Sequence, residues 1–384
     1  MKLVHNRFFP IVAFVLTTCF VMLFAGSVSV LAAESSNGVF DADELFTERD
    51  FEQTADPSEA TYYTLSDGSD VHITEAGVYV LSGTASNVTV YVEADDADKV
   101  QLVLNGAYVT NEDFPCIYVK SADKVFVTTS EDSSLSVTGT FAKDGDTNTD
   151  GVIFSRCDLV LNGTAALTIS STDNGVVCKD DLKVTGGTYI VNSTTKCLEA
   201  NDSIRVADGN LQLAAGTDAL HAEYDDDDTV GYIYIGGGDI SILAGDDGIH
   251  AMTVVQIDGG NLSISASEGI EGSYVQINGG TISIYSWDDG INGAQKSSAY
   301  WPTIEINGGY ITVAMASGDT DGIDCNGNLI ITGGTINVTG TSTFDIDGTQ
   351  TFTGGTVIVN GQQVDTLPNQ MGMMGGRGGW GRRG

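Results

Sequence analysis

Basic residues are scarce in this sequence. Lys and Arg number 16 against 52 Asp and Glu, and the formal net charge of the 384-residue chain is -36. A field of that sign repels nucleic acid and anionic membrane surfaces, and it attracts divalent cations. We therefore expect neither a nucleic-acid-binding protein nor a membrane-surface protein.

Long apolar segments are also nearly absent, apart from one at the N-terminus. An apolar run from Ile11 to Ala25 follows Lys2 and Arg7 and precedes Leu31-Ala32-Ala33. This order indicates a signal peptide over residues 1–33, cleaved after about Ala32 or Ala33. A membrane anchor is the alternative, but the run is short and lacks a stop-transfer flank. We expect a secreted protein, extracellular or associated with the cell surface, without membrane insertion.

Cysteine is too sparse and too irregularly placed for a disulfide framework. Five cysteines follow the predicted leader, an odd number, and none has CxxC spacing. Free thiols buried along a core are expected, and a cysteine zinc site is not. They are Cys116, Cys157, Cys178, Cys197 and Cys325.

Helix-forming stretches are scarce too, whereas Ile, Val, Thr, Gly and Asn dominate a repeated phrase. Two strands, in which apolar residues alternate with polar ones, flank a Gly-Gly or Asn-Gly turn, and an acidic turn follows. The second glycines of these turns recur at intervals of 20 to 29 residues, which is typical of a solenoid. They are Gly187, Gly209, Gly238, Gly260, Gly280, Gly309, Gly334 and Gly355. We expect these glycines to adopt the positive φ that a tight corner needs.

The pattern predicts an all-β parallel β-helix with coils of roughly 22 residues, each pairing in parallel with the next. The main repeat spans residues 146–362. Residues 61–145 repeat less cleanly and are interpreted as an N-terminal cap with the first coils. Residues 34–60 are interpreted as an acidic linker, and residues 363–384 as a flexible Gly/Met/Arg tail.

One corner of successive coils carries carboxylates beside Gly-Ile. The phrases are Asp246-Asp247-Gly248-Ile249, Glu268-Gly269-Ile270-Glu271, Asp288-Asp289-Gly290-Ile291-Asn292 and Asp321-Gly322-Ile323-Asp324, with a weaker copy at Asp218. At about 4.8 Å between coils these charges repel one another. Several calcium ions, each bound by six to eight oxygens, would neutralise them. The alternative is a solvated acidic face, but the phase of the carboxylates with the repeat favours metal.

At these turns the sequence resembles the secreted clostridial carbohydrate-binding β-helix family, which is structurally akin to family-nine pectate lyases. The likeness extends upstream through Val100–Gly106 and Gly175–Leu182 and covers nearly the whole chain after the predicted linker. It implies a right-handed single-stranded parallel β-helix with calcium in the acidic turns. It also implies binding of plant-wall polysaccharide such as cellulose or polygalacturonate. Carried over by position, the calcium ligand candidates are Asp218, Asp246, Asp247, Glu268, Glu271, Asp288, Asp289, Asn292, Asp321 and Asp324.

Two lysines bear on whether the chain is an enzyme. A pectate-type lyase needs a base to remove the proton beside the uronic carboxylate. Lys196 and Lys296 are the candidates near the acidic corner, but neither lies in a matching catalytic motif. Lys196 stands where later coils place an acid, so calcium is expected from the Asp218 coil onward. His221 and His250 are interpreted as turn residues beside metal. A monomeric binding protein is favoured over a calcium-dependent lyase acting by β-elimination.

Neutral glycans would require aromatic surfaces instead of calcium. Aromatic residues gather around the Asp288 turn and the insertion after it, and they form either a stacking platform or the packing of that insertion. They are Tyr285, Trp287, Tyr300, Trp301 and Tyr310. A third possibility is a structural spacer or adhesin on the cell surface.

Overall fold

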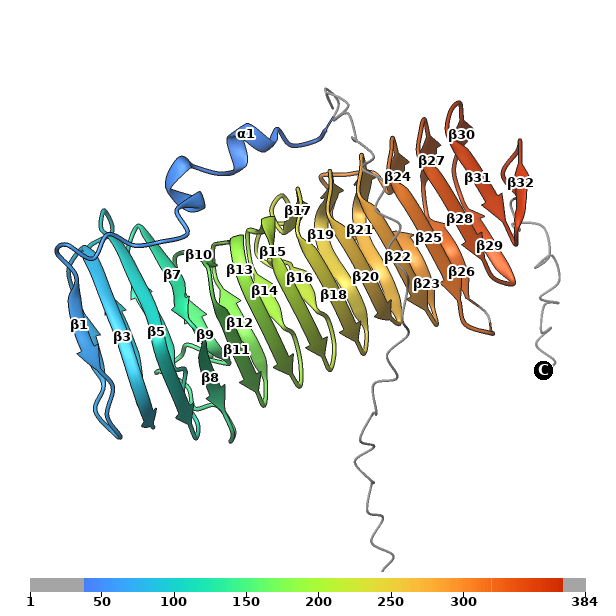
Figure 1. Ribbon diagram of the computed structural model, residues 1–384. Coiled ribbons are helices and arrows are strands. Elements are labelled where there is room, and N and C mark those ends of the chain that lie inside the picture. The colour runs from blue at the N-terminus through green and yellow to red at the C-terminus, as the bar shows by residue number, and fades with distance from the viewer. Residues whose placement is uncertain (1–37, 319, 369–384) are drawn as a thin grey trace, which may run out of the picture. The chain divides into compact units, whose positions relative to one another are not determined.

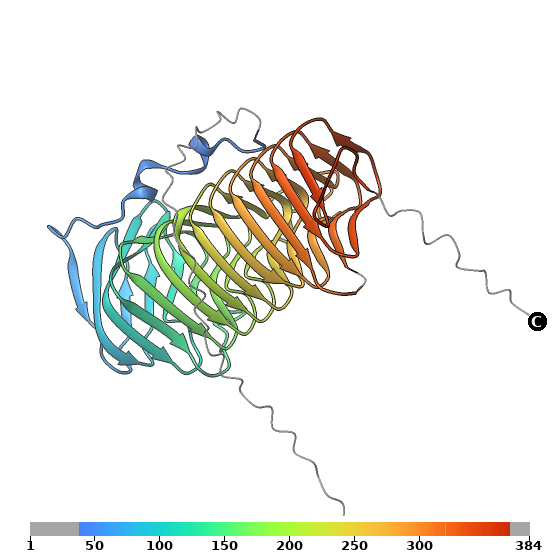
Figure 2. The ribbon, with the colours of Figure 1, turned by 45° about the vertical axis from the view of Figure 1, so that its right-hand side comes forward.

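The computed structural model describes residues 38–318 and 320–368. Strands dominate these residues, with one four-residue α-helix and one four-residue 3-10 helix, so the all-β prediction is confirmed. The strands stack one after another in Figures 1 and 2. None of the helices in the described residues has the length and hydropathy of a membrane-crossing segment. The predicted signal peptide and most of the predicted tail lie outside the described residues.

Strand pairing follows the repeat and makes three ladders, in which each strand pairs in parallel with its counterpart in the next repeat. The first ladder carries the acidic corner. It contains β2 (Val71–Ile73), β4 (Val90–Glu93), β6 (Ile117–Ser121), β9 (Gly151–Ser155), β12 (Asn174–Cys178), β14 (Leu198–Ala200), β16 (Leu220–Ala222), the start of β19 (Asp247–Ile257) and of β21 (Glu268–Ile277), β23 (Asp289–Gly293), β26 (Asp321–Cys325) and β29 (Ser342–Ile346).

The second ladder runs from β1 to β30. It contains β1 (Thr61–Thr64), β3 (Gly77–Ser86), β5 (Lys99–Asn111), β7 (Lys124–Glu131), β10 (Asp158–Gly163), β13 (Asp181–Ser193), β15 (Ser203–Ala215), β17 (Tyr232–Ile235), the ends of β19 and β21, β24 (Thr303–Ile306), β27 (Asn328–Ile331) and β30 (Gln350–Phe352).

The third ladder joins the ends of β3, β5, β13 and β15 to the remaining strands. These are β8 (Ser133–Val137), β11 (Ala166–Ser171), β18 (Asp239–Ala244), β20 (Asn261–Ala266), β22 (Thr281–Ser286), β25 (Tyr310–Met315), β28 (Thr335–Thr339) and β31 (Thr356–Val359). The last strand, β32 (Gln362–Val364), pairs antiparallel with β31 and includes the first residues of the predicted tail.

The glycine corners and the core follow from the alternating pattern. All eight second glycines of the turns have positive φ, between 80° and 127°, as predicted. Inward Ile, Leu and Val side chains from the three ladders form one continuous core. Four of the five cysteines are buried and all five are free, whereas Cys157 is only half-buried. Burial of each large aliphatic side chain contributes about 1.5–3 kcal/mol.

The N-terminal segment, residues 38–60, packs against the second ladder through α1 (Ala42–Leu45) and the 3-10 helix η1 (Glu48–Phe51). Asp50 of η1 is fully buried, and its carboxylate lies 3.3 Å from Lys124 Nζ and 3.6 Å from Lys183 Nζ. Gln53 bonds the backbone of two strands by donating to Thr185 O and accepting from Gly163 N. This part of the predicted linker is therefore fixed to the strands.

Candidate acidic metal site on the first ladder

One outward-facing residue per repeat forms a continuous column on the first ladder, which we call the outer column. In early repeats its members are Tyr118, Phe154 and Val177, and they make a small apolar cluster. From β14 onward the column becomes polar and charged. Its members there are Glu199, His221, His250, Glu271, Asn292, Asp324 and Asp345.

A second column, the entry column, lies three residues earlier in each repeat. It consists of Lys196, Asp218, Asp247, Glu268, Asp289 and Asp321, and the pairing of Asp247 with Glu268 and of Asp289 with Asp321 fixes its register. The chain bends between the two columns at a small residue. At Gly269 a Cβ would lie only 2.3 Å from Gly290 O and 2.5 Å from Ile284 Cγ2. Glycine therefore lets the corner close, which brings the two columns together.

In the first repeats of this polar region, lysine side chains form ion pairs with the carboxylates. Glu199 lies 3.3 Å from Lys179 Nζ and 3.4 Å from Lys196 Nζ. Burial raises the pKa of Glu199, but Lys196 and Lys179 outweigh it and lower the pKa. Lys296 Nζ lies 3.0 Å from Glu271 Oε2. Both lysines considered as lyase bases are thus ion-paired with outer-column carboxylates.

His250 lies among three carboxylates. Its Nδ1 is 2.7 Å from Asp247 Oδ2 and 2.9 Å from Glu271 Oε2, and its Nε2 is 3.5 Å from Glu223 Oε2. Burial lowers the pKa of His250, but these contacts raise it to about 11. The interpretation of His221 and His250 as turn residues is wrong, because both are buried strand residues of β16 and β19.

Farther along the ladder the carboxylates have no such partners. Among the ion pairs of the described residues, none involves Glu268, Asp289 or Asp324. Burial first, and then repulsion from neighbouring carboxylates, raises the pKa of Glu268 to about 7, that of Asp289 to about 8 and that of Asp324 to about 6. We name Glu268, Asp289, Asp321, Asp324 and Asn292 the distal acidic site.

Asn292 tests whether the distal acidic site suits a cation. Its Nδ2 donates to Glu268 Oε2 at 2.9 Å and to Glu271 Oε1 at 3.3 Å. Its Oδ1 is buried and has no hydrogen-bond partner among the described residues. An unpaired buried carbonyl oxygen beside carboxylates with raised pKa values suits a hard divalent cation, because calcium binds amide and carboxylate oxygens.

The other predicted ligands are distributed differently. Asp246 and Asp288 are exposed on the turns, and Asp218 and Asp247 contact histidine. Groups of three Asp, Glu, His or Cys ligand atoms within 4.8 Å of one another occur three times in the described residues. Their members are His221, Glu223 and His250; Asp247, His250 and Glu271; and Asp158, Asp180 and Asp181. The distal carboxylates do not form such a trio in the described residues.

The five aromatic candidates do not form one stacked platform. Tyr285, Trp287, Trp301 and Tyr310 are exposed, which leaves them available to a ligand. In the described residues only Tyr300 among the five has a ring partner, and that partner is Tyr274 with centroids 6.2 Å apart. Tyr285 and Trp287 directly precede the Asp288 turn in the sequence, within four residues of Asp289.

Pockets flank the ladders, and two of them adjoin residues described above. One, of about 350 Å³, is lined by Lys179, Lys196, Glu199, His221 and Glu223 together with neighbouring loop residues. The other, of about 410 Å³, lies between the N-terminal segment and the second ladder.

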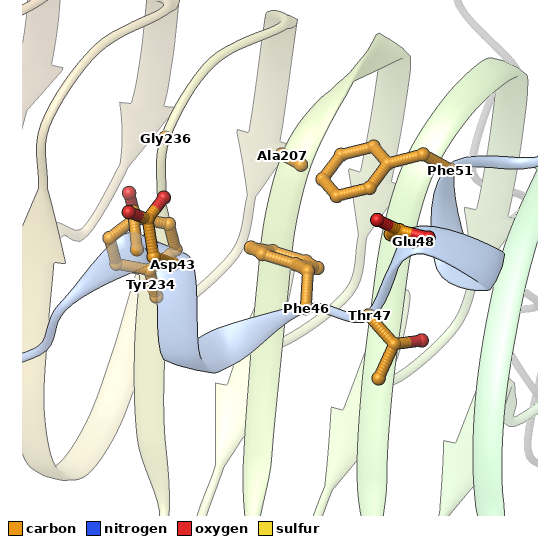
Figure 3. Close-up of a pocket in the computed structure, with 9 residues that line it drawn as sticks. Asp43, Phe46, Thr47, Glu48, Phe51, Ala207, Tyr234 and Gly236 are labelled. Carbon is orange, nitrogen blue, oxygen red and sulfur yellow. The ribbon is translucent and has the colours of Figure 1, made fainter.

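This N-terminal pocket is both aromatic and acidic. Figure 3 shows Phe46 and Phe51 of the N-terminal segment and Tyr234 of β17 around it, with the carboxylates of Asp43 and Glu48 at its edge. The Phe46 ring lies 5.4 Å from that of Phe51 and 6.1 Å from that of Tyr234. No sequence pattern indicated this pocket, because only the packing of the N-terminal segment creates it.

Comparison with known proteins identifies the family of this chain. A family model described as carbohydrate-binding domain-containing protein matches residues 67–322 and 268–366. The chain belongs to this family. A member from Acetivibrio thermocellus is 32% identical over 129 residues, which are 32% of this chain and 45% of that protein. The chain thus matches less than half the length of that curated relative.

A solved structure gives a second likeness. It is described as a polysaccharide lyase-like protein from C. thermocellum in a gadolinium derivative, and it superposes with a TM-score of 0.52 at 28% identity. The match covers 58% of this chain and 96% of that one. Family membership supports carbohydrate binding by this chain.

Proposed function

We propose that the protein is a secreted, calcium-dependent carbohydrate-binding protein whose distal acidic site holds calcium. The observation that carries the proposal is the set of carboxylates without cationic partners around the unpaired Asn292 Oδ1. Glu268, Asp289, Asp324 and the Asn292 carbonyl are hard oxygen donors of the kind calcium prefers. Histidine partners leave Asp218 and Asp247 less available.

The same site explains how an acidic protein can hold an acidic glycan. Bound calcium supplies positive charge that protein and uronate carboxylates share. Without it, a chain of net charge -36 repels polygalacturonate. Tyr285 and Trp287, exposed directly before the Asp288 turn, offer ring faces to a sugar of the same polysaccharide chain. We propose polygalacturonate as the preferred glycan, with cellulose as the comparison.

The ion pairs that Lys296 and Lys196 form favour a binding function over β-elimination. Burial lowers the pKa of Lys296, but its contact with Glu271 outweighs burial and raises the pKa. A raised pKa keeps the ammonium protonated, so Lys296 is a poor general base. The Lys196 ammonium lies in an ion pair with Glu199. The likeness to a polysaccharide lyase-like protein keeps lyase activity as the alternative to be tested.

The fold and location proposed with this function are those expected from the sequence. The three parallel ladders support a right-handed parallel β-helix, because crossovers between parallel strands are almost always right-handed. This fold is the basis for the proposed kinship with pectate lyases. A cleaved leader at residues 1–33 would deliver the protein outside the cell, where plant-wall polysaccharide is available.

The test is a pull-down of metal-free protein on insoluble polygalacturonate and on cellulose, with and without added calcium. We expect retention on polygalacturonate only with calcium, and weaker retention for Asp289→Asn than for the control Asp96→Asn, which changes an exposed carboxylate elsewhere. Retention that ignores calcium but is lost in Phe46→Ala would place the sugar in the N-terminal pocket and contradict the proposal. Release of products with unsaturated-uronide absorbance would show a lyase.

A further inference from the structure

His221 and His250 occupy neighbouring positions of the outer column, and their imidazole rings stack. The ring centroids are 4.6 Å apart at an interplanar angle of 13°. Both Nε2 atoms approach the same carboxylate oxygen, Glu223 Oε2, at 3.2 Å for His221 and 3.5 Å for His250. Two imidazole nitrogens and one carboxylate oxygen therefore converge on one point.

The opposite nitrogen of each ring lies beside a carboxylate. Asp218 Oδ2 is 2.9 Å from His221 Nδ1, and Asp247 Oδ2 is 2.7 Å from His250 Nδ1. A carboxylate beside Nδ1 favours a proton on that nitrogen, and a metal ion at Nε2 would displace the proton that His250 carries there in the metal-free protein. The same carboxylate–histidine arrangement orients imidazoles that bind metals in proteins.

A second observation points independently to a missing ligand. His250 is buried, with 7% of its surface exposed, and its Nε2 makes no hydrogen bond within the described part of the chain. Buried ring nitrogens normally have a partner, and leaving one unpaired costs about 1–3 kcal/mol. The atom is directed toward Glu223, where a cation would complete its contacts.

We propose that His221, His250 and Glu223 bind one divalent transition-metal ion of the zinc type. Zinc binds two His and one Glu at about 2.0–2.2 Å, so tetrahedral ligand atoms lie about 3.3 Å apart. The separations of 3.2 and 3.5 Å fit that geometry. Calcium is unsuited to these nitrogen ligands because it takes oxygen.

The fourth coordination position is left for an exogenous ligand. His221 and Glu223 line the 350 Å³ pocket, and Lys179 and Lys196 lie in the same lining. Glu199, Asp225 and Asp226 line the pocket as well, so the metal ion itself would supply the positive charge that holds an oxygen ligand from solvent or from a glycan carboxylate. This site is separate from the distal acidic site and goes beyond the calcium-dependent function proposed above.

The experiment uses the untagged mature chain, stripped of metal and then kept in excess calcium. Calorimetry with Zn²⁺ should show one ion bound per chain, and Co²⁺ should give the intense visible absorption of a four-coordinate site. Because calcium is present throughout, failure of the calcium proposal would leave this result unaffected. Zn²⁺ binding that excess calcium abolishes would overturn the separate site.

Variants locate the ion. Glu223→Gln and His250→Gln should each weaken Zn²⁺ at least tenfold, as should the orienting variant Asp218→Asn. His72→Gln is the matched control, because His72 lies on the same ladder 3.5 Å from Glu93 and should leave affinity unchanged. Glu223 is only half-buried, so Glu223→Gln keeps the test valid if a histidine variant fails to fold. Equal Zn²⁺ affinity in wild type and Glu223→Gln, or no saturable binding, would refute the site.

Discussion

Asp289→Asn should change stability in opposite directions with and without calcium. Asp289 lies in register with Asp321 and is repelled by Asp324, Glu268 and Asp288. At a pH above about 8, where Asp289 is ionised in the metal-free protein, removing its charge relieves this repulsion. The same change removes a proposed calcium ligand. We therefore expect the variant to be more stable than wild type without calcium, and to gain less stability when calcium is added.

The magnitude follows from the ladder spacing. Two unit charges about 4.8 Å apart repel by about 1 kcal/mol in water and by about 3 kcal/mol at an effective dielectric constant of about 20. Unfolding about 330 residues carries an entropy near 0.7 kcal/mol/K, so relief of one such pair raises Tm by about 1–5 °C. Calcium at about 100 times its Kd adds about 2.7 kcal/mol per site, or about 4 °C.

Differential scanning calorimetry of metal-free and calcium-saturated protein measures both effects. Asp96→Asn, an exposed carboxylate outside the site, should stay within about 0.5 kcal/mol of wild type in both conditions. If Asp289→Asn were destabilising without calcium, or responded to calcium as fully as wild type, the reasoning about unpartnered charges would be refuted.

Three further predictions concern the charged groups. Because the folded-state pKa values of Asp324, Glu268 and Asp289 are raised from their ordinary values of 3.8, 4.5 and 3.8 to about 6, 7 and 8, metal-free protein should lose stability as pH rises from about 4 to about 8 and level off above that. Saturating calcium should suppress the loss, and a Tm of metal-free protein that rises across the window would contradict the shifts. Asp50→Ala should cost about 3–5 kcal/mol in denaturant unfolding, because Lys124 and Lys183 lose a buried counter-ion. The exposed Glu48→Ala is its control, and equal losses would count against a special role for the buried pair. Lys296→Gln should leave calcium affinity and glycan retention unchanged, and tighter calcium binding in calorimetry would show that the ion lies at Glu271 instead, because the variant frees that carboxylate.

Much of the fold could be predicted from the sequence because the repeat itself fixes register. Once strands pair in parallel with their copies one repeat away, the phase of Asp-Gly-Ile places Asp289 beside Asp321 without further information. The turn glycines were predictable for the same reason, since their positive φ is a local requirement. The position of Lys196 among the acidic residues of the entry column was predictable from the repeat as well.

Which charged side chains contact one another could not be predicted from their positions within the repeat alone. The close bend at Gly248 makes residues three apart contact each other, so His250 meets Asp247 instead of lying on a turn. The available signal was the recurrence of His at the same place in Asp218-Ala-Leu-His221 and Asp247-Gly-Ile-His250. The packing of Asp50 onto Lys124 and Lys183 rests on contacts between residues far apart in sequence, and no local pattern indicated it.

The proposed function is tested most directly by an adsorption isotherm of the protein on polygalacturonate across a series of buffered free calcium concentrations. We predict that adsorption rises and saturates with calcium, and that Asp289→Asn shifts the curve to higher calcium while Asp96→Asn does not. Adsorption that is equally strong in metal-free buffer, or equally weak at saturating calcium, would contradict calcium-dependent carbohydrate binding at the distal acidic site.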